Sequence, residues 1–141
     1  MFKKGFYGGK FLPFHKGHLH CALEASGLVE ELHVVLFHSG EEEKALLNQD
    51  IKFDKKMLEP RIREMVIRRE FNQFPHIKIH VIDCSKLEPI EGYTSWEVEA
   101  LEVRKVIGDF DVVFSSEPTY GIIFNKLYNH VTHQIVDADR T

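Results

Sequence analysis

The sequence predicts an α/β protein whose doubly wound parallel sheet has five strands, with helices on both faces. Two observations support this prediction. Short apolar runs typical of buried strands alternate with longer stretches of helical periodicity along the chain. No tandem repeat or low-complexity linker interrupts this alternation. Such alternation is typical of βαβ units with right-handed crossovers, and the expected architecture is therefore Rossmann-like.

The predicted strands are short segments in which apolar or β-branched residues dominate. They are residues 3–8, 32–37, 77–82, 111–114 and 134–136. The nearly continuous apolar run of residues 32–37 fits a strand that is buried on both faces of a parallel sheet.

Helices are predicted between the strands from apolar residues at helical spacing and from residues typical of helix ends. The first spans about 17–26 and ends at Gly27. The second starts at Pro60, which suits the first turn of a helix, and reaches about residue 72. Its apolar side is expected to comprise Ile62, Met65, Val66 and Phe71. Its opposite, polar side is expected to comprise Arg61, Arg63, Arg68 and Arg69.

The third predicted helix begins with a capping box at residues 94–97 and ends at Gly108. Its apolar side is expected to comprise Trp96, Ala100, Leu101 and Ile107. A further helix is predicted to begin at Pro118 and to include Ile123, Phe124 and Leu127. Residues 39–56 are predicted to form a loop or short surface helix, either as a cover over a site or as a solvated connection.

The composition is that of an ordinary globular protein, and we expect residues 1–141 to form a single domain. The formal net charge of −4 argues against nucleic acid as a partner, because binding to a phosphate backbone needs a basic face. No apolar run approaches the ~18 residues of a membrane span, and the N-terminus lacks a signal-peptide core. We therefore expect a cytoplasmic protein without a membrane partner, in which Cys21 and Cys84 are reduced, packed thiols.

Three segments with functional character fall at the carboxyl ends of predicted strands. They are residues 8–18, 37–40 and 115–118. In a doubly wound parallel sheet, ligands bind at this edge near the point where the strand order reverses. We therefore expect the three segments to converge on one active site.

The segment after the first strand has the layout of a phosphate site. His15 and His18 are three residues apart at the start of a helix, so both can lie on one helix face. The N-terminus of that helix offers free backbone N–H groups, and Gly17 allows close approach to a ligand. Imidazoles that donate to phosphoryl oxygens stabilise the charge that develops during phosphoryl transfer. Lys10 and Lys16 add positive charge.

Two other interpretations of the histidine pair stay open. Histidines at this spacing can ligate zinc, but His38 is the only candidate for a third ligand. The favoured interpretation is therefore that the pair binds no metal. The pair can also be purely structural. The segment matches neither the GxGxxG dinucleotide fingerprint nor the P-loop pattern.

Residues 9–18, Gly-Lys-Phe-Leu-Pro-Phe-His-Lys-Gly-His, resemble the HxGH signature of the nucleotidyltransferase superfamily within the pattern G-x-F-x-P-x-H-x-G-H. The sequence is most similar to the nicotinamide mononucleotide (NMN) adenylyltransferase domain of the bifunctional NAD-biosynthesis regulators. Residues 111–121 and 137–140 also resemble that group. The likeness therefore covers most of the chain in order.

This resemblance implies that a phosphate monoester attacks the α-phosphate of ATP, which is bound with Mg²⁺, and that pyrophosphate is released. It implies a catalytic or triphosphate-binding role for His15, His18 and Lys10. Nucleotide-binding residues are expected to be Gly8, Gly9, Phe11, Gly17, Ser115, Ser116, Glu117 and Tyr120. Acceptor-binding residues are expected to be Trp96 and His38, with Trp96 either stacking on a nicotinamide ring or packing in the core. The expected partners are ATP and a small phosphorylated substrate.

The superfamily normally carries a second phosphate motif, ISxTxxR, after the last strand, and the sequence reaches Thr141 about where it would begin. Three interpretations follow: an abbreviated or truncated enzyme, a homo-oligomer whose neighbouring subunit supplies the cation, or a module that binds nucleotides without turnover. The arginines of the second predicted helix are either substitutes or ordinary surface charges. A cytidylyltransferase with another acceptor is a further alternative.

Overall fold

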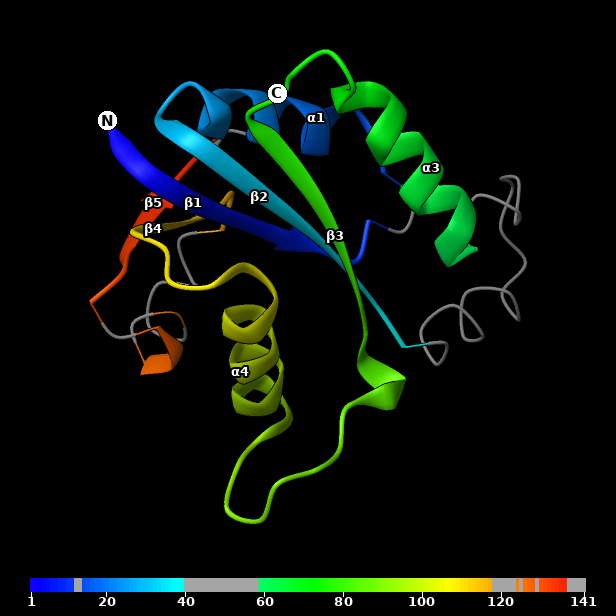
Figure 1. Cartoon of the computed structure of the whole chain (residues 1–141), viewed down its shortest axis with the longest axis vertical. Coiled ribbons are helices and arrows are strands. Elements are labelled where there is room, and N and C mark those ends of the chain that lie inside the picture. Colours follow the sequence, from blue (N-terminus) through cyan, green and yellow to red (C-terminus); the bar gives the residue numbers. More distant parts are fainter. Residues whose placement is uncertain (12–13, 40–58, 118–123, 125, 129, 137–141) are drawn as a thin grey trace.

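The computed structural model describes residues 1–11, 14–39, 59–117, 124, 126–128 and 130–136 (Figure 1). Its sheet has five parallel strands in the order β3-β2-β1-β4-β5, which confirms the predicted fold class. The strands are β1 (Phe2–Gly9), β2 (Val29–His38), β3 (Ile77–Asp83), β4 (Val112–Ser115) and β5 (Thr132–Ile135). The helices are α1 (Lys16–Ser26), α3 (Pro60–Phe71) and α4 (Ser95–Ile107), and a 3₁₀ turn, η2, spans Cys84–Lys86.

The sheet separates two hydrophobic clusters, because successive residues of a strand point to opposite faces. Tyr7 of β1 packs in the cluster that α1 and α3 cover, and its neighbour Phe6 packs in the cluster that α4 covers. Figure 1 shows α1 and α3 on one side of the sheet and α4 on the other. The strand order changes direction at β1, which pairs with both β2 and β4.

Residues that the sequence predicted to cap helices do so at α1 and α4. Gly27 is the C-cap of α1, and Thr94 and Glu97 form the predicted capping box of α4. Gly108 follows α4 with φ 76°, a backbone conformation that favours glycine. These contacts are local in sequence, which explains why the helix starts could be predicted.

The predicted apolar side of α3 is partly wrong: Phe71 is buried as expected, but Ile62, Met65 and Val66 are not. The side that faces the core carries Arg63, Ile67 and Phe71, whereas Met65 is 49% exposed. Arg63 is only 1% exposed, although the sequence assigned it to the polar side with the other arginines. The physical reason is a contact outside the helix, because its guanidinium donates a hydrogen bond to the carbonyl oxygen of Lys10.

The predicted apolar side of α4 is partly wrong as well. Ala100 and Ile107 are buried as expected, but Val103 completes that face, and Leu101 and Trp96 are 45% and 48% exposed. Trp96 is therefore not a core residue, which removes one of its two interpretations.

Several predicted features lie outside the described residues. They are the segment 40–56, most of the helix expected after Pro118, and the stretch 137–141. None of the described helices is both long and apolar enough to cross a membrane.

Candidate active site

A cavity of about 590 Å³ opens at the carboxyl ends of β1 and β4, where the strand order reverses. This is the position at which open α/β sheets bind ligands. The loop after β1, the end of β4 and Phe37 of β2 all line it, and α4 closes one side. Described residues of the predicted segments 8–18 and 115–118 therefore meet at this cavity as expected, and segment 37–40 contributes Phe37.

Most of the residues expected to bind substrate line this cavity. They are Gly8, Gly9, Lys10, Phe11, His18, Trp96, Ser115, Ser116 and Glu117. His15, Gly17 and His38 are not among its lining residues, and Tyr120 lies outside the described part of the chain. His38 instead directs Nδ1 toward the carboxylate of Asp83, at 3.8 Å.

Backbone hydrogen bonds select the tautomer of both histidines in the loop. The backbone N–H of Gly17 donates to Nδ1 of His15 at 3.0 Å, and the backbone N–H of His15 donates to Nδ1 of His18 at 3.1 Å. A ring nitrogen that accepts a hydrogen bond carries no proton, so each neutral ring carries its proton on Nε2. Both rings are thus arranged as neutral donors through Nε2.

Aromatic contacts restrict the orientation of His18. Its ring stacks on that of His15 with centroids 3.8 Å apart, and it meets Phe11 edge-on at 4.9 Å. Phe14 also stacks on the His18 ring, with the two centroids 5.6 Å apart. The ring therefore has little freedom to turn away from the cavity.

The backbone of the loop is closely packed and strained. An added Cβ at Gly9 would lie 2.8 Å from the Phe11 ring, and one at Gly8 would lie 2.7 Å from the Phe37 ring. Phe11 itself has φ 50°, a conformation that is costly for a bulky residue. The guanidinium of Arg63 donates to the carbonyl oxygen of Lys10, immediately before Phe11. A buried charge thus braces the strained turn, a role that helical periodicity gave no means to predict.

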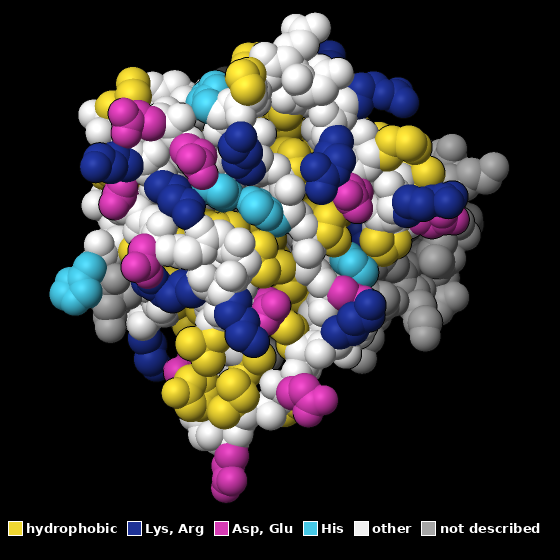
Figure 2. Space-filling model, in the orientation of Figure 1, with side chains coloured by type: hydrophobic (Ala, Val, Ile, Leu, Met, Phe, Trp, Pro, Cys, Tyr) yellow, Lys and Arg dark blue, Asp and Glu magenta, His cyan; other side chains and the backbone are white. Residues whose placement is uncertain are grey.

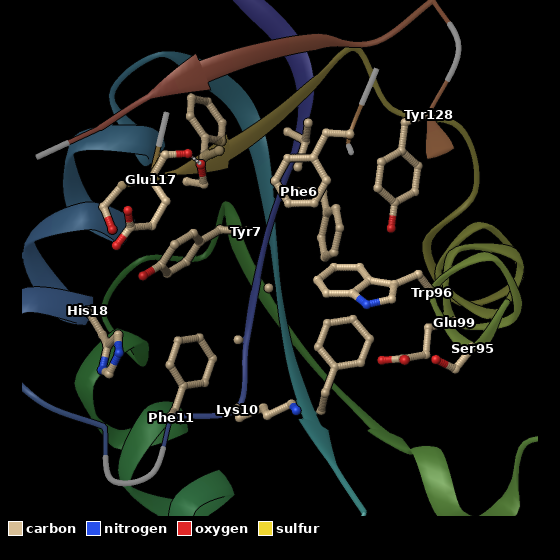
Figure 3. Close-up of a pocket in the computed structure, with 18 residues that line it drawn as sticks. Phe6, Tyr7, Lys10, Phe11, His18, Ser95, Trp96, Glu99, Glu117 and Tyr128 are labelled. Carbon is tan, nitrogen blue, oxygen red and sulfur yellow. Dashed lines mark hydrogen bonds between the residues drawn. The ribbon is translucent and has the colours of Figure 1, made fainter. Parts of the chain in front are cut away.

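The cavity has two halves, which lie on either side of β1 (Figure 3). Tyr7, Phe11, His18 and Glu117 lie on one side of the strand. Phe6, Trp96, Glu99, Ser95 and Tyr128 lie on the side of α4. The first half carries the histidine suited to a phosphate, and the second offers apolar rings.

Glu99, Ser95 and Tyr128 line the cavity but were not predicted to do so. Glu99 follows Trp96 by three residues, so the shared helix face was a usable signal. Its carboxylate accepts a hydrogen bond from the Cys84 thiol at 3.6 Å. Burial, reinforced by the charge of Glu99, raises the pKa of Cys84 to about 12, so the thiol remains protonated.

Ser115 is held by a neighbour from the next strand. Its hydroxyl oxygen lies 2.6 Å from Nε2 of His133 on β5 and 3.1 Å from the carbonyl oxygen of Glu117. Burial lowers the pKa of His133, which keeps its ring neutral. This contact fixes the end of β4 where it borders the cavity.

The described residues contain no group of three or more His, Cys, Asp or Glu side chains arranged to hold a metal ion. The zinc interpretation of the histidine pair therefore finds no third ligand there. In particular, His38 points to Asp83.

The parallel α/β sheet carries a histidine-bearing loop at its switch point, where such folds bind ligands. The chain belongs to the cytidylyltransferase-like family, whose sequence profile matches residues 6–122. It is therefore a nucleotidyltransferase of that family, as the HxGH segment indicated.

Among individual proteins, the chain is similar to the trifunctional NAD biosynthesis/regulator protein NadR of Escherichia coli strain K12. The two are 25% identical over 113 residues, which cover 77% of this chain and 27% of that protein. The chain thus spans about a quarter of the length of this relative.

Solved structures share the fold. A NadR protein in complex with NAD and AMP-PNP superposes with a TM-score of 0.69 at 19% identity, over 97% of this chain and 38% of that one. A bifunctional NMN adenylyltransferase/ADP ribose pyrophosphatase from Francisella tularensis gives a TM-score of 0.67 at 15% identity, over 97% and 38% of the two chains.

Proposed function

We propose that this chain transfers AMP from ATP to nicotinamide mononucleotide, forming NAD and releasing pyrophosphate. The observation that carries the proposal is the two-part cavity, which has His18 at one end and the half-exposed Trp96 at the other. The distant likeness to NadR and to an NMN adenylyltransferase supports this choice of acceptor.

In the proposed reaction, a phosphate oxygen of the acceptor attacks the α-phosphorus of ATP. A new P–O bond forms there, the bond to the oxygen bridging to the β-phosphate breaks, and pyrophosphate leaves. His18 would donate its Nε2 proton in a hydrogen bond to phosphoryl oxygens as negative charge develops, with His15 beside it. Neither histidine needs to lose its proton, and no covalent intermediate on the protein is required.

The remaining groups would position the two substrates. Lys10 would attract phosphate from the carboxyl end of β1, and Gly8 and Gly9 would let the ligand approach the backbone. Mg²⁺ would arrive with ATP as part of the substrate. Trp96 would provide a surface for the acceptor ring, and Ser115, Ser116 and Glu117 would border the nucleotide.

The test is to incubate the purified chain with ATP, Mg²⁺ and NMN, and to measure NAD and pyrophosphate. We expect equal amounts of both products, loss of both in His18→Ala, and little change in His20→Ala, whose histidine is exposed on the same helix. CTP in place of ATP tests the cytidylyl alternative. Binding of ATP by calorimetry without pyrophosphate release from any acceptor would refute the proposal and favour a non-catalytic module.

A further inference from the structure

The hydroxyl of Ser115 has a small set of hydrogen-bond partners at the end of β4. Its oxygen lies 3.1 Å from the carbonyl oxygen of Glu117 and 2.6 Å from Nε2 of His133 on β5. The contact with Glu117 is drawn as a dashed line in Figure 3. Ser115 lines the cavity and is only 8% exposed. These two partners therefore decide what the hydroxyl can offer to a ligand.

Counting protons gives each of the two contacts a direction. A serine hydroxyl has one proton to donate and two lone pairs that accept. A carbonyl oxygen can only accept, so the hydroxyl proton of Ser115 is donated to Glu117. His133 then donates from Nε2 to the Ser115 oxygen, and its neutral ring carries the proton on Nε2. One lone pair of the hydroxyl is left.

The sheet and an aromatic neighbour hold His133 in place. In the pairing of β4 with β5, His133 lies opposite Val113, and Ile135 lies opposite Ser115. Residues two apart on a strand lie on the same face, so His133 reaches the Ser115 side chain diagonally across the two strands. The ring of Phe124 meets the His133 ring edge-on, with the centroids 5.3 Å apart. The orientation of the imidazole is thus set independently of any ligand.

We propose that His133 is a positioning residue that makes Ser115 a hydrogen-bond acceptor for the bound nucleotide, an inference that rests on the proposed function. Because its proton is already donated, Ser115 has none for the phosphate oxygens of Mg²⁺-bound ATP, which only accept. It can accept from a hydroxyl or an amino group. The end of β4 therefore contacts the nucleoside part of ATP, through a ribose hydroxyl or the 6-amino group of adenine, and the triphosphate belongs to the histidine loop.

The first test is calorimetric binding of nucleotides to the purified chain with Mg²⁺ and without an acceptor. The ligands are ATP, 2′-deoxy-ATP, 3′-deoxy-ATP and inosine triphosphate, which lacks the amino group. We expect the analogue without the relevant donor to bind about three- to tenfold less tightly than ATP, the value of one neutral hydrogen bond. Ser115→Ala should weaken ATP by the same factor and should not weaken that analogue further.

Two substitutions test the role of His133. His133→Gln keeps an N–H donor and should bind ATP nearly as the wild type does, whereas His133→Leu should weaken ATP by about three- to tenfold. In a chain that already carries Ser115→Ala, His133→Leu should cause no further loss. In turnover, His133→Leu should raise KM for ATP with little change in kcat. The matched control is Thr132→Val at the exposed neighbouring position of β5, which should bind ATP normally.

The tautomer of His133 gives a direct spectroscopic readout. In a long-range ¹H–¹⁵N spectrum, protonated and unprotonated ring nitrogens of a neutral histidine have different shifts. The signals of His133 are those that disappear in His133→Gln. We expect its proton on Nε2, and a neutral ring with the proton on Nδ1 would overturn the inference.

The binding outcomes separate this inference from the proposed function, because they are measured without turnover. Analogue penalties that Ser115→Ala leaves unchanged, equal losses in His133→Gln and His133→Leu, or no nucleotide binding would each overturn the inference. NAD formation together with any of the first two results would refute the inference alone. The expected binding pattern without NAD formation would support the inference and refute the proposed transferase activity.

Discussion

Lowering the pH should destabilise the fold through a partly buried histidine pair that does not line the cavity. Nδ1 of His33 lies 2.7 Å from Nε2 of His80, and Nε2 of His33 contacts the carboxylate of Glu31. If His33 donates to Glu31, its Nδ1 accepts the proton of His80, so both rings are neutral. In the space-filling view, histidine side chains lie between Lys and Arg side chains above α4 (Figure 2).

The sign of the effect follows from the pKa of His80. Burial, followed by repulsion from His33 and from Arg68, lowers that pKa from 6.5 to about 4. Burial also lowers the pKa of His33, against the opposing contact with Glu31. The unfolded chain therefore binds more protons than the folded chain between about pH 6.5 and pH 4. Stability contributed by this pair is present above pH 6.5 and is lost as the pH falls through that window.

The magnitude can be worked out for the change from pH 7 to pH 5. The full shift of His80 would cost about 1.8 kcal/mol over this range by proton linkage. Because His80 is only partly buried, solvent reduces this value, and we expect about 1 kcal/mol. Ending at pH 5 keeps most carboxylates ionised, which leaves histidines as the main titrating groups.

The assay is urea unfolding of the wild type and of His80→Gln at pH 7, 6 and 5. Gln can still donate to Nδ1 of His33 but cannot take up a proton, so the variant should lose less stability than the wild type. The control is His20→Gln, which replaces an exposed histidine and should follow the wild type. If wild type and His80→Gln lost equal stability between pH 7 and 5, the reasoning would be refuted.

Three further substitutions have defined outcomes. Thr94→Ala removes the cap of α4 and should lower the free energy of unfolding by about 1 kcal/mol, measured by urea denaturation at pH 7. Gly8→Ala places a Cβ 2.8 Å from the Phe6 ring. It should lower the free energy of NMN binding, measured by calorimetry, more than it lowers the free energy of unfolding. Arg63→Lys keeps the charge but loses the planar donor to Lys10, so kcat should fall with a smaller change in KM for ATP. Unchanged kcat in Arg63→Lys would argue against the bracing role.

The elements that the sequence predicted well are those specified by neighbouring residues. The capping box at Thr94 and the glycine at Gly108 act within a few residues, and both lie where expected. The strands followed from short apolar runs, although β2 is longer at both ends than the predicted 32–37. Convergence at the carboxyl ends of the strands needed only the parallel topology, because that topology brings those ends together.

The features that sequence reasoning missed depend on contacts between distant segments. His33 is 6% exposed, as the predicted buried strand 32–37 implies, but its contact with His80 of β3 joins segments 47 residues apart and could not be predicted. Glu99 was missed although it shares a helix face with Trp96, because the packing of α4 decides which of its residues reach the cavity. His38, in contrast, was expected at the site but does not line the cavity. It ends β2 at the correct edge of the sheet, but its ring points toward Asp83.

The burial of Arg63 shows why the rotation of α3 could not be predicted from hydrophobicity. By apolar content alone, Ile62, Met65 and Val66 form the better inward face. The observed rotation exposes Met65 and buries an arginine, although removing a guanidinium from water costs several kcal/mol. Burial of Ile67 and Phe71 offsets part of that cost, and the hydrogen bond to Lys10 gives the guanidinium a charge-assisted contact. That contact lies immediately before Phe11, the strained residue packed against His18. The helix therefore departs from its hydrophobic pattern where the loop needs support, as expected when a functional site competes with stability.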